Sequence, residues 1–149
     1  MSDSDIGKFV NPGLARSEEY KETLLKIEKG EYCPFCWENL SKEHKKPILK
    51  QTEFWLVTEN QFSYQRARVK LLLIFRYHTN SILDISKEAW SELLDIYREM
   101  YIKFNLQGST IFNRQGNTRF TGGTVKHLHF HLISGHGESE ETVVIARVG

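Results

Sequence analysis

Residues 122–133 read Gly-Gly-Thr-Val-Lys-His-Leu-His-Phe-His-Leu-Ile, a stretch in which three histidines alternate with apolar residues. Successive side chains of an extended strand point to opposite faces of a sheet. We therefore expect His127, His129 and His131 on one face and the intervening apolar residues on the other. Half of the six histidines lie here, and histidine readily exchanges protons, attacks electrophiles or binds metals near neutral pH. The stretch predicts a strand with one buried face and one chemically active face.

Three interpretations of these histidines are open from the residues alone. Two histidines two positions apart on a strand can bind one metal ion, although His127 and His131 lie about 13 Å apart along an extended strand. One imidazole can instead act as a nucleophile while its neighbours orient it and bind an anion. A solvated polar face needs no function, but three alternating histidines after two glycines make this interpretation the weakest.

The composition fits a single globular domain of 149 residues. Its 20 lysines and arginines balance 19 aspartates and glutamates, so charge gives no reason to expect nucleic acid or a membrane as partner. The start of the chain lacks a signal-peptide pattern, and no apolar run approaches membrane-spanning length. We expect a cytoplasmic protein in which residues 1–16 form an N-terminal tail without chemistry and residues 17–149 form one domain.

Helical periodicity occurs in two segments. Residues 17–30 begin with a capping serine, carry apolar residues on one face and end at a glycine. Over residues 87–106, apolar and aromatic residues recur at steps of three and four. Both segments are predicted to be amphipathic helices.

Apolar runs between these helices and around them predict strands. The predicted segments are 48–52, 53–58, 68–75, 109–113 and a β-rich end at 142–148. Polar loops are predicted at 41–46, 59–68 and 114–123. Together with the histidine strand, this order predicts an α+β domain with an antiparallel sheet.

Cys33 and Cys36 are the two cysteines of the chain, spaced C-x-x-C. In a reducing compartment this spacing indicates half of a zinc site or a thioredoxin-like redox pair, and two shielded thiols in a turn are a third alternative. The strand-then-helix context of a redox pair is missing from the sequence. Half of a zinc site is therefore favoured, and tetrahedral zinc needs two further ligands.

The motif His127-Leu128-His129-Phe130-His131-Leu132-Ile133 resembles the His-φ-His-φ-His-φ-φ pattern (φ apolar) of the histidine triad (HIT) superfamily of nucleotidyl hydrolases and transferases. Similarity covers roughly residues 31–135. It includes Ile111-Phe112-Asn113 before a glycine-bearing loop, Gly122-Gly123-Thr124, Ser134-Gly135, and Tyr77-His78 after an apolar strand. The resemblance implies one antiparallel sheet with two helices, usually paired as a homodimer with a continuous sheet.

The implied chemistry is attack by His129 on the α-phosphorus of a nucleoside phosphoramidate, acyl-adenylate or dinucleoside polyphosphate. A nucleotidyl-histidine intermediate then passes its nucleotide to water or another acceptor. In relatives, a backbone carbonyl at the position of His127 orients the nucleophile, and His131 would donate to a phosphate oxygen. Two other classes stay open: a zinc-dependent hydrolase with the triad as ligands, and a catalytically idle nucleotide-binding module.

Substrate contacts outside the triad are also implied. Thr124 stands where relatives often carry a serine that meets the phosphate or leaving group, and Asn113 matches an asparagine on the same side. By the same resemblance, Asn60 would correspond to the Asp or Asn that binds the ribose hydroxyls in relatives. The backbone at Gly123 can approach a phosphate closely because glycine has no side chain, although many relatives carry glutamine there.

The loop at 114–123 is longer than in the compact phosphoramidase branch. We hypothesise that Arg114 or Arg119 supplies phosphate-binding charge in place of that glutamine. Lys126 is a weaker candidate, since strand alternation points it away from the histidine face. Lys70 lies near the position of an additional active-site histidine in some branches, which leaves the substrate class open.

Some branches of the superfamily hold a structural zinc ion. Its ligands there are a C-x-x-C pair, a histidine after the central strand and the first triad histidine, which correspond to Cys33, Cys36, His78 and His127. His44 is the rival third ligand because it is close to the cysteines in sequence. Such a site leaves the carbonyl of His127 available to orient the nucleophile.

Overall fold

The structure is a computed structural model that describes residues 7–62, 64–139 and 143–148. Over these residues the helices are α1 (Glu18–Gly30), α2 (Trp37–Glu43) and α3 (Lys87–Lys103). The strands are β1 (Ile48–Gln51), β2 (Trp55–Glu59), β3 (Ala67–Phe75), β4 (Thr110–Asn113) and β5 (His129–Gly135). All neighbouring strands are antiparallel, in the order β1-β2-β3-β5-β4. The predicted α+β class is confirmed.

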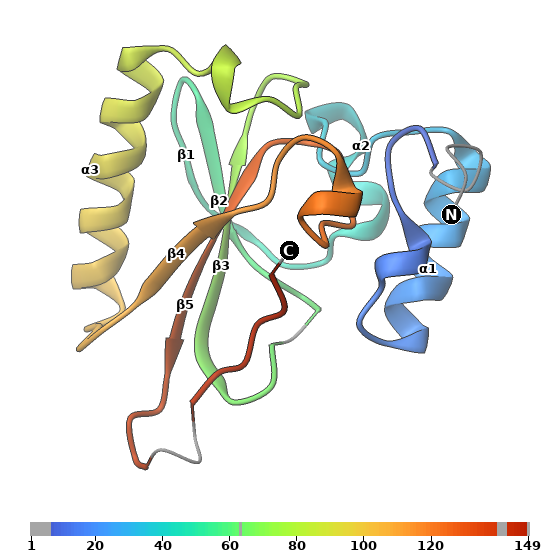
Figure 1. The fold of residues 1–149 in the computed structure, drawn as a ribbon. Coiled ribbons are helices and arrows are strands. Elements are labelled where there is room, and N and C mark those ends of the chain that lie inside the picture. The colour runs from blue at the N-terminus through green and yellow to red at the C-terminus, as the bar shows by residue number, and fades with distance from the viewer. Residues whose placement is uncertain (1–6, 63, 140–142, 149) are drawn as a thin grey trace.

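The helices cover opposite sides of the sheet, with α3 on one face and α1 and α2 on the other side (Figure 1). Strand β3 shows why its sequence is apolar over residues 71–75. Leu71 and Leu73 pack in the core formed with α3, whereas Leu72 and Ile74 pack with Leu40 of α2. A strand covered on both faces reads as a continuous apolar run.

Strand β5 carries the expected alternation. Leu128 and Leu132 belong to the core under α3. His131 is the register partner of Leu72 and His129 that of Ile74, so both histidines lie on the face toward α1 and α2. The strand begins at His129, two residues later than predicted, and His127 lies in the irregular segment just before it.

Both predicted helices begin at their predicted capping serines, but one helix ends earlier than predicted and a third helix was not predicted. The side chain of Ser17 accepts the Tyr20 N–H, and Ser86 accepts the Ala89 N–H. Helix α3 ends at Lys103, before the predicted 106, because Asn105 adopts a left-handed conformation with φ of 47°. Helix α2 was missed, since seven residues with one buried side chain give too little periodicity to identify a helix.

The tail before α1 is docked on the domain. Val10 forms an isolated bridge with Val125, and the Asn11 N–H donates to the Thr124 carbonyl at 2.8 Å. At the other end, residues 143–148 form no strand, so the predicted β-rich segment is wrong there, and residue 142 lies outside the described residues. None of the helices in the described ranges could cross a bilayer.

Candidate functional site

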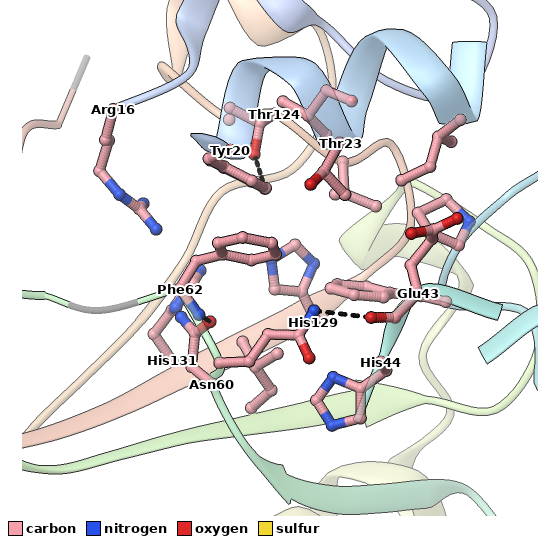
Figure 2. A pocket seen from close by; sticks show the side chains of 18 of the residues that line it. Arg16, Tyr20, Thr23, Glu43, His44, Asn60, Phe62, Thr124, His129 and His131 are labelled. Atoms are coloured by element: carbon pink, nitrogen blue, oxygen red, sulfur yellow. Dashed lines mark hydrogen bonds between the residues drawn. The ribbon is translucent and has the colours of Figure 1, made fainter. Parts of the chain in front are cut away.

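A cavity lies between the histidine face of the sheet and helix α1 (Figure 2). His129 and His131 of β5 form part of its wall, and Tyr20 of α1 lies opposite them. The tail, the segment after Cys33, the loop before β3 and the loop after β4 supply the other sides. Their lining residues include Arg16, Phe35, His44, Asn60, Phe62, Arg114, Gly123 and Thr124.

His129 is held in one tautomer by the backbone. Its Nδ1 lies 2.6 Å from the carbonyl oxygen of His127, so Nδ1–H donates to that carbonyl. The lone pair therefore resides on Nε2. Asn113 donates from its side-chain amide to the carbonyl of His129 at 2.6 Å, and Phe35 packs edge-on against the imidazole with centroids 4.9 Å apart. The ring is thus fixed in orientation with a nucleophilic nitrogen available.

Burial keeps this imidazole neutral. His129 is 6% exposed, and burial is the main cause that lowers its pKa to about 4. The bond to the His127 carbonyl opposes this shift, while the positive charges of Arg114 and Arg16 lower the pKa further. Near neutral pH, His129 is a neutral and nucleophilic imidazole.

His131 is positioned by packing. Its ring stacks on Phe112 with centroids 4.7 Å apart and an interplanar angle of 12°, and the Tyr64 ring meets it edge-on at 5.7 Å. Its Nδ1 is buried and has no hydrogen-bond partner among the described residues. Burial, then the charges of His129, Arg114 and Arg16, hold its pKa well below the usual range. No described residue hydrogen-bonds to either ring nitrogen of His131, so its single N–H is not committed to a described protein group.

A second cluster brings together Cys33, Cys36, His78 and His127, whose ligand atoms all lie within 4.8 Å of one another. The Nδ1 atoms of His78 and His127 are 3.3 Å apart, and sulfur–nitrogen distances are 3.3, 3.4 and 3.8 Å. Around one tetrahedral zinc ion, two nitrogens are separated by about 3.4 Å and a nitrogen and a sulfur by about 3.6 Å. The four predicted ligands therefore fit one zinc ion.

The protonation of His127 suits this cluster. Its Nε2 lies 2.6 Å from the carbonyl oxygen of Phe75, so the ring hydrogen is on Nε2 and Nδ1 faces the sulfurs as an unprotonated ligand. The backbone carbonyl of the same residue holds His129. His44 is outside the cluster and bonds Thr58 Oγ1 through Nε2 at 2.7 Å, which agrees with its lower rank as a ligand.

The thiols lack the character of a redox pair. Burial raises the pKa of Cys33, and burial followed by the neighbouring Cys33 raises that of Cys36 to about 12. Reactive C-x-x-C thiols have lowered pKa values, whereas zinc itself deprotonates the thiols that bind it. This difference favours the metal interpretation.

The predicted substrate-binding residues divide into two groups. Thr124, Gly123 and Asn60 line the cavity, and the Thr124 hydroxyl is 2.6 Å from the Tyr20 hydroxyl. The Gly123 N–H already donates to Thr121 Oγ1 at 3.1 Å. Asn113 does not line the cavity and instead supports His129 through its carbonyl.

Among the basic residues, Arg114 is part of the cavity wall and Arg119 is not. The Lys126 side chain points away and bonds the Gly7 carbonyl. Sequence reasoning missed Arg16 and Tyr20 as cavity-lining residues, and Arg16 belongs to the tail that was predicted to carry no chemistry. The signal at this position was weak: one arginine directly before a helix cap.

Comparison with known proteins agrees with this geometry. A family model described as the HIT domain matches residues 42–138, and no curated protein sequence matches the chain. A histidine triad nucleotide-binding protein from Candida albicans has a similar structure, with 20% identity, coverage of 78% of this chain and 81% of that chain, and a TM-score of 0.60.

Two further solved structures are similar. A Zn-bound histidine triad family protein from Mycobacterium smegmatis has 19% identity, coverage of 74% and 79%, and a TM-score of 0.57. A HIT family hydrolase from Clostridium thermocellum has 23% identity, coverage of 73% and 95%, and a TM-score of 0.55. At these identities, the structures show a shared fold.

Proposed function

Because this chain belongs to the HIT domain family, we propose that it is a nucleotide hydrolase or nucleotidyl transferase with His129 as nucleophile. The observation that carries the proposal is the 2.6 Å bond from His129 Nδ1 to the His127 carbonyl, beside a cavity. This bond leaves Nε2 available to attack an α-phosphorus. The substrate would be a nucleoside phosphoramidate, acyl-adenylate or dinucleoside polyphosphate.

In the first step, His129 Nε2 forms a bond to the α-phosphorus while the bond to the leaving group breaks. The His127 carbonyl then stabilises the positive imidazole ring through Nδ1–H, and His131 donates to a non-bridging phosphate oxygen. In the second step, water attacks the phosphorus, the phosphorus–nitrogen bond breaks, and the electron pair returns to Nε2. A water proton is lost to solvent, and another acceptor in place of water gives transfer instead of hydrolysis.

Thr124 is our proposed contact to the leaving group. Burial raises the pKa of its partner Tyr20, which therefore remains a hydroxyl and can supply or accept the hydrogen between the two oxygens. Asn60 is buried in the cavity wall and is proposed to face the ribose. Asn113 is a positioning residue that acts through the carbonyl of His129. The backbone of Gly123 lies close to Arg114, since a Cβ on it would be 3.3 Å from Arg114 Cβ, and we propose that this backbone faces a phosphate.

We propose a structural role for zinc at Cys33, Cys36, His78 and His127. When bound, zinc would supply a cross-link between the segment before α2 and the start of β5. Four protein ligands fill the coordination of a structural site, whereas catalytic zinc keeps an open position. Neither His129 nor His131 belongs to the cluster, and a similar structure is Zn-bound. These points favour His129 over a zinc-dependent hydrolase.

Homodimerisation and a cytoplasmic location are also proposed. The outer face of α3 exposes Trp90, Leu94 and Ile102, and β4 is an edge strand, which would suit pairing through a helix and a strand. Sedimentation of the wild type and Leu94→Glu would test the dimer, with a shift to monomer expected. A zinc-binding cysteine pair suits a reducing compartment.

Turnover of adenosine phosphoramidate tests the function. We expect AMP and ammonia from the wild type, no turnover by His129→Asn, and wild-type turnover by His136→Asn, a matched change in an exposed turn. A brief chelator treatment should leave initial turnover intact. Instant loss with chelator would favour the zinc hydrolase. Nucleotide binding without turnover of this substrate, an acyl-adenylate or a dinucleoside polyphosphate would favour the idle binding module.

A further inference from the structure

Two arginines from distant parts of the chain meet on one tyrosine oxygen beside the histidine pair. Arg16 Nη1 donates to the Tyr64 hydroxyl oxygen at 2.9 Å, and Arg114 Nη1 donates to the same oxygen at 3.0 Å. A phenol oxygen has two acceptor lone pairs, and both are used by the guanidinium groups. Tyr64 therefore joins the two side chains without neutralising their charge.

No carboxylate of the described residues lies within ion-pair distance of either guanidinium. Arg114 is only 7% exposed, and its buried Nε has no hydrogen-bond partner in the described part of the chain. A buried charge is costly unless it is paired. A pair of unneutralised guanidinium groups with an unpartnered N–H is therefore suited to an anion.

This positive charge lies against the proposed catalytic histidines. Arg114 and Arg16 both line the cavity that contains His129 and His131, with Arg16 extending toward it from the tail (Figure 2). The Arg114 guanidinium lies 4.8 Å from the centroid of the Phe112 ring, which in turn stacks on His131. The pair thus adjoins the place where His131 would meet the α-phosphate.

We propose that Arg16 and Arg114 form a subsite for phosphate groups beyond the α-phosphate. The preferred substrate class would then be nucleotides with a phosphate leaving group, such as dinucleoside polyphosphates, over nucleoside phosphoramidates. This inference rests on the proposed function. It goes further by naming the leaving group and assigning a specificity-determining role to the tail through Arg16.

The chemistry explains the preference. When His129 Nε2 attacks the α-phosphorus of a polyphosphate, the bond to the bridging oxygen breaks and its electron pair departs with the phosphate chain. The bridging oxygen thereby gains negative charge, which two guanidinium groups stabilise more in the transition state than in the ground state. An amine leaving group takes up a proton and departs neutral, so it offers the arginines no such charge.

The test compares kcat/KM for diadenosine tetraphosphate and adenosine phosphoramidate. Arg16 is exposed at the cavity rim, so Arg16→Gln should fold. We expect the ratio of the two kcat/KM values to fall by about tenfold or more in Arg16→Gln, the size of one charged hydrogen bond. Arg119→Gln, in the same loop as Arg114 but away from the cavity wall, should keep the wild-type ratio. An unchanged ratio in Arg16→Gln would overturn the inference.

A binding measurement separates this inference from the proposed function. In a His129→Asn background, calorimetry should give tighter binding of ADP than of AMP, and Arg16→Gln should remove most of that difference. An equal loss of kcat/KM for both substrates would assign the arginines to the α-phosphate. That result would overturn the inference and leave the proposed function unaffected. Absence of all turnover by the wild type would defeat the function, while the ADP-to-AMP comparison would still decide whether the subsite exists.

Discussion

The two faces of β5 are buried almost equally and use that burial differently. Leu132 is fully buried among apolar side chains under α3, where burial contributes stability through packing. His131, its neighbour on the other face, is 5% exposed beside arginines and aromatic rings. There, burial lowers the pKa of the imidazole. Through alternation alone, one strand therefore contributes to the packed core on one face and to the cavity wall on the other.

The two faces also differ in whether their buried polar groups have hydrogen-bond partners. On the cavity face, His131 Nδ1 and Arg114 Nε are buried without partners among the described residues. On the α3 face, the indole N–H of Trp55 donates to the Ala89 carbonyl at 2.8 Å. Unpartnered buried groups reduce stability. Two of the three such atoms among the described residues thus lie at the cavity, the third being Asn11 Oδ1, which suits a face that receives a ligand.

The largest expected effect is on the packed face. Leu132→Ala should lower the free energy of unfolding by about 2–5 kcal/mol, because it leaves a cavity in a close-packed core. Urea denaturation would measure this change. Leu83→Ala is the matched control, since Leu83 is 88% exposed and should change stability by about 0.5 kcal/mol or less. Similar losses in both variants would contradict the assignment of Leu132 to the core.

A substitution on the cavity face of β5 should change activity more than stability. His131→Gln should lower kcat by about 10²- to 10³-fold, the range for loss of one transition-state hydrogen-bond donor. Single-turnover kinetics would measure it, and urea denaturation would check that the fold persists. His136→Gln provides the matched control in an exposed turn. A stable His131→Gln enzyme with wild-type kcat would rule out the proposed donor role.

The proposed zinc ion would bind His127, directly before β5, together with Cys33, Cys36 and His78. Cys33→Ser should weaken zinc binding by more than about 100-fold, because even partners one shell beyond a metal contribute 10- to 100-fold. Competition with a chromophoric chelator would measure the affinity. His44→Gln should retain zinc, since His44 bonds Thr58 outside the cluster. Loss of zinc from His44→Gln with retention in Cys33→Ser would reverse the ligand assignment.

The smallest effect concerns pH. Burial lowers the pKa of His129 to about 4, so His129 stays neutral and nucleophilic from pH 7.5 down to 5.5 and becomes protonated only as the pH falls through about 4. Zinc at His127 would act in the same direction. The rate of the first chemical step should therefore change by about twofold or less over this range. A histidine with the ordinary pKa of about 6.5 would lose about tenfold, and that result would contradict the effect of burial.

Local patterns predicted much of the fold and both clusters. Period-two alternation predicted the faces of β5, and the apolar run of β3 predicted a buried strand. The metal cluster was expected from the resemblance, because Cys33 belongs to a C-x-x-C pair and His78 follows the central strand. These features depend on residues close in sequence or on a shared motif.

Features that depend on tertiary contact were not predictable in the same way. Arg16 reaches the cavity because the tail docks through Val10 against Val125, and the tail has no periodicity that would indicate this. Tyr64 lies in a polar loop where nothing in the sequence marks it as the meeting point of two arginines. Asn113 was expected to contact substrate but supports a backbone carbonyl, a distinction that requires side-chain geometry.

The most direct test is mass spectrometry of the intact protein after a brief acid-free quench with adenosine phosphoramidate and, separately, with diadenosine tetraphosphate. We expect an adenylyl adduct, mapped to His129, on the wild type and on His136→Asn, with none on His129→Asn. Equal adduct on the wild type and His129→Asn would contradict His129 as the nucleophile. Turnover by the wild type with no adduct at any quench time would contradict a covalent intermediate.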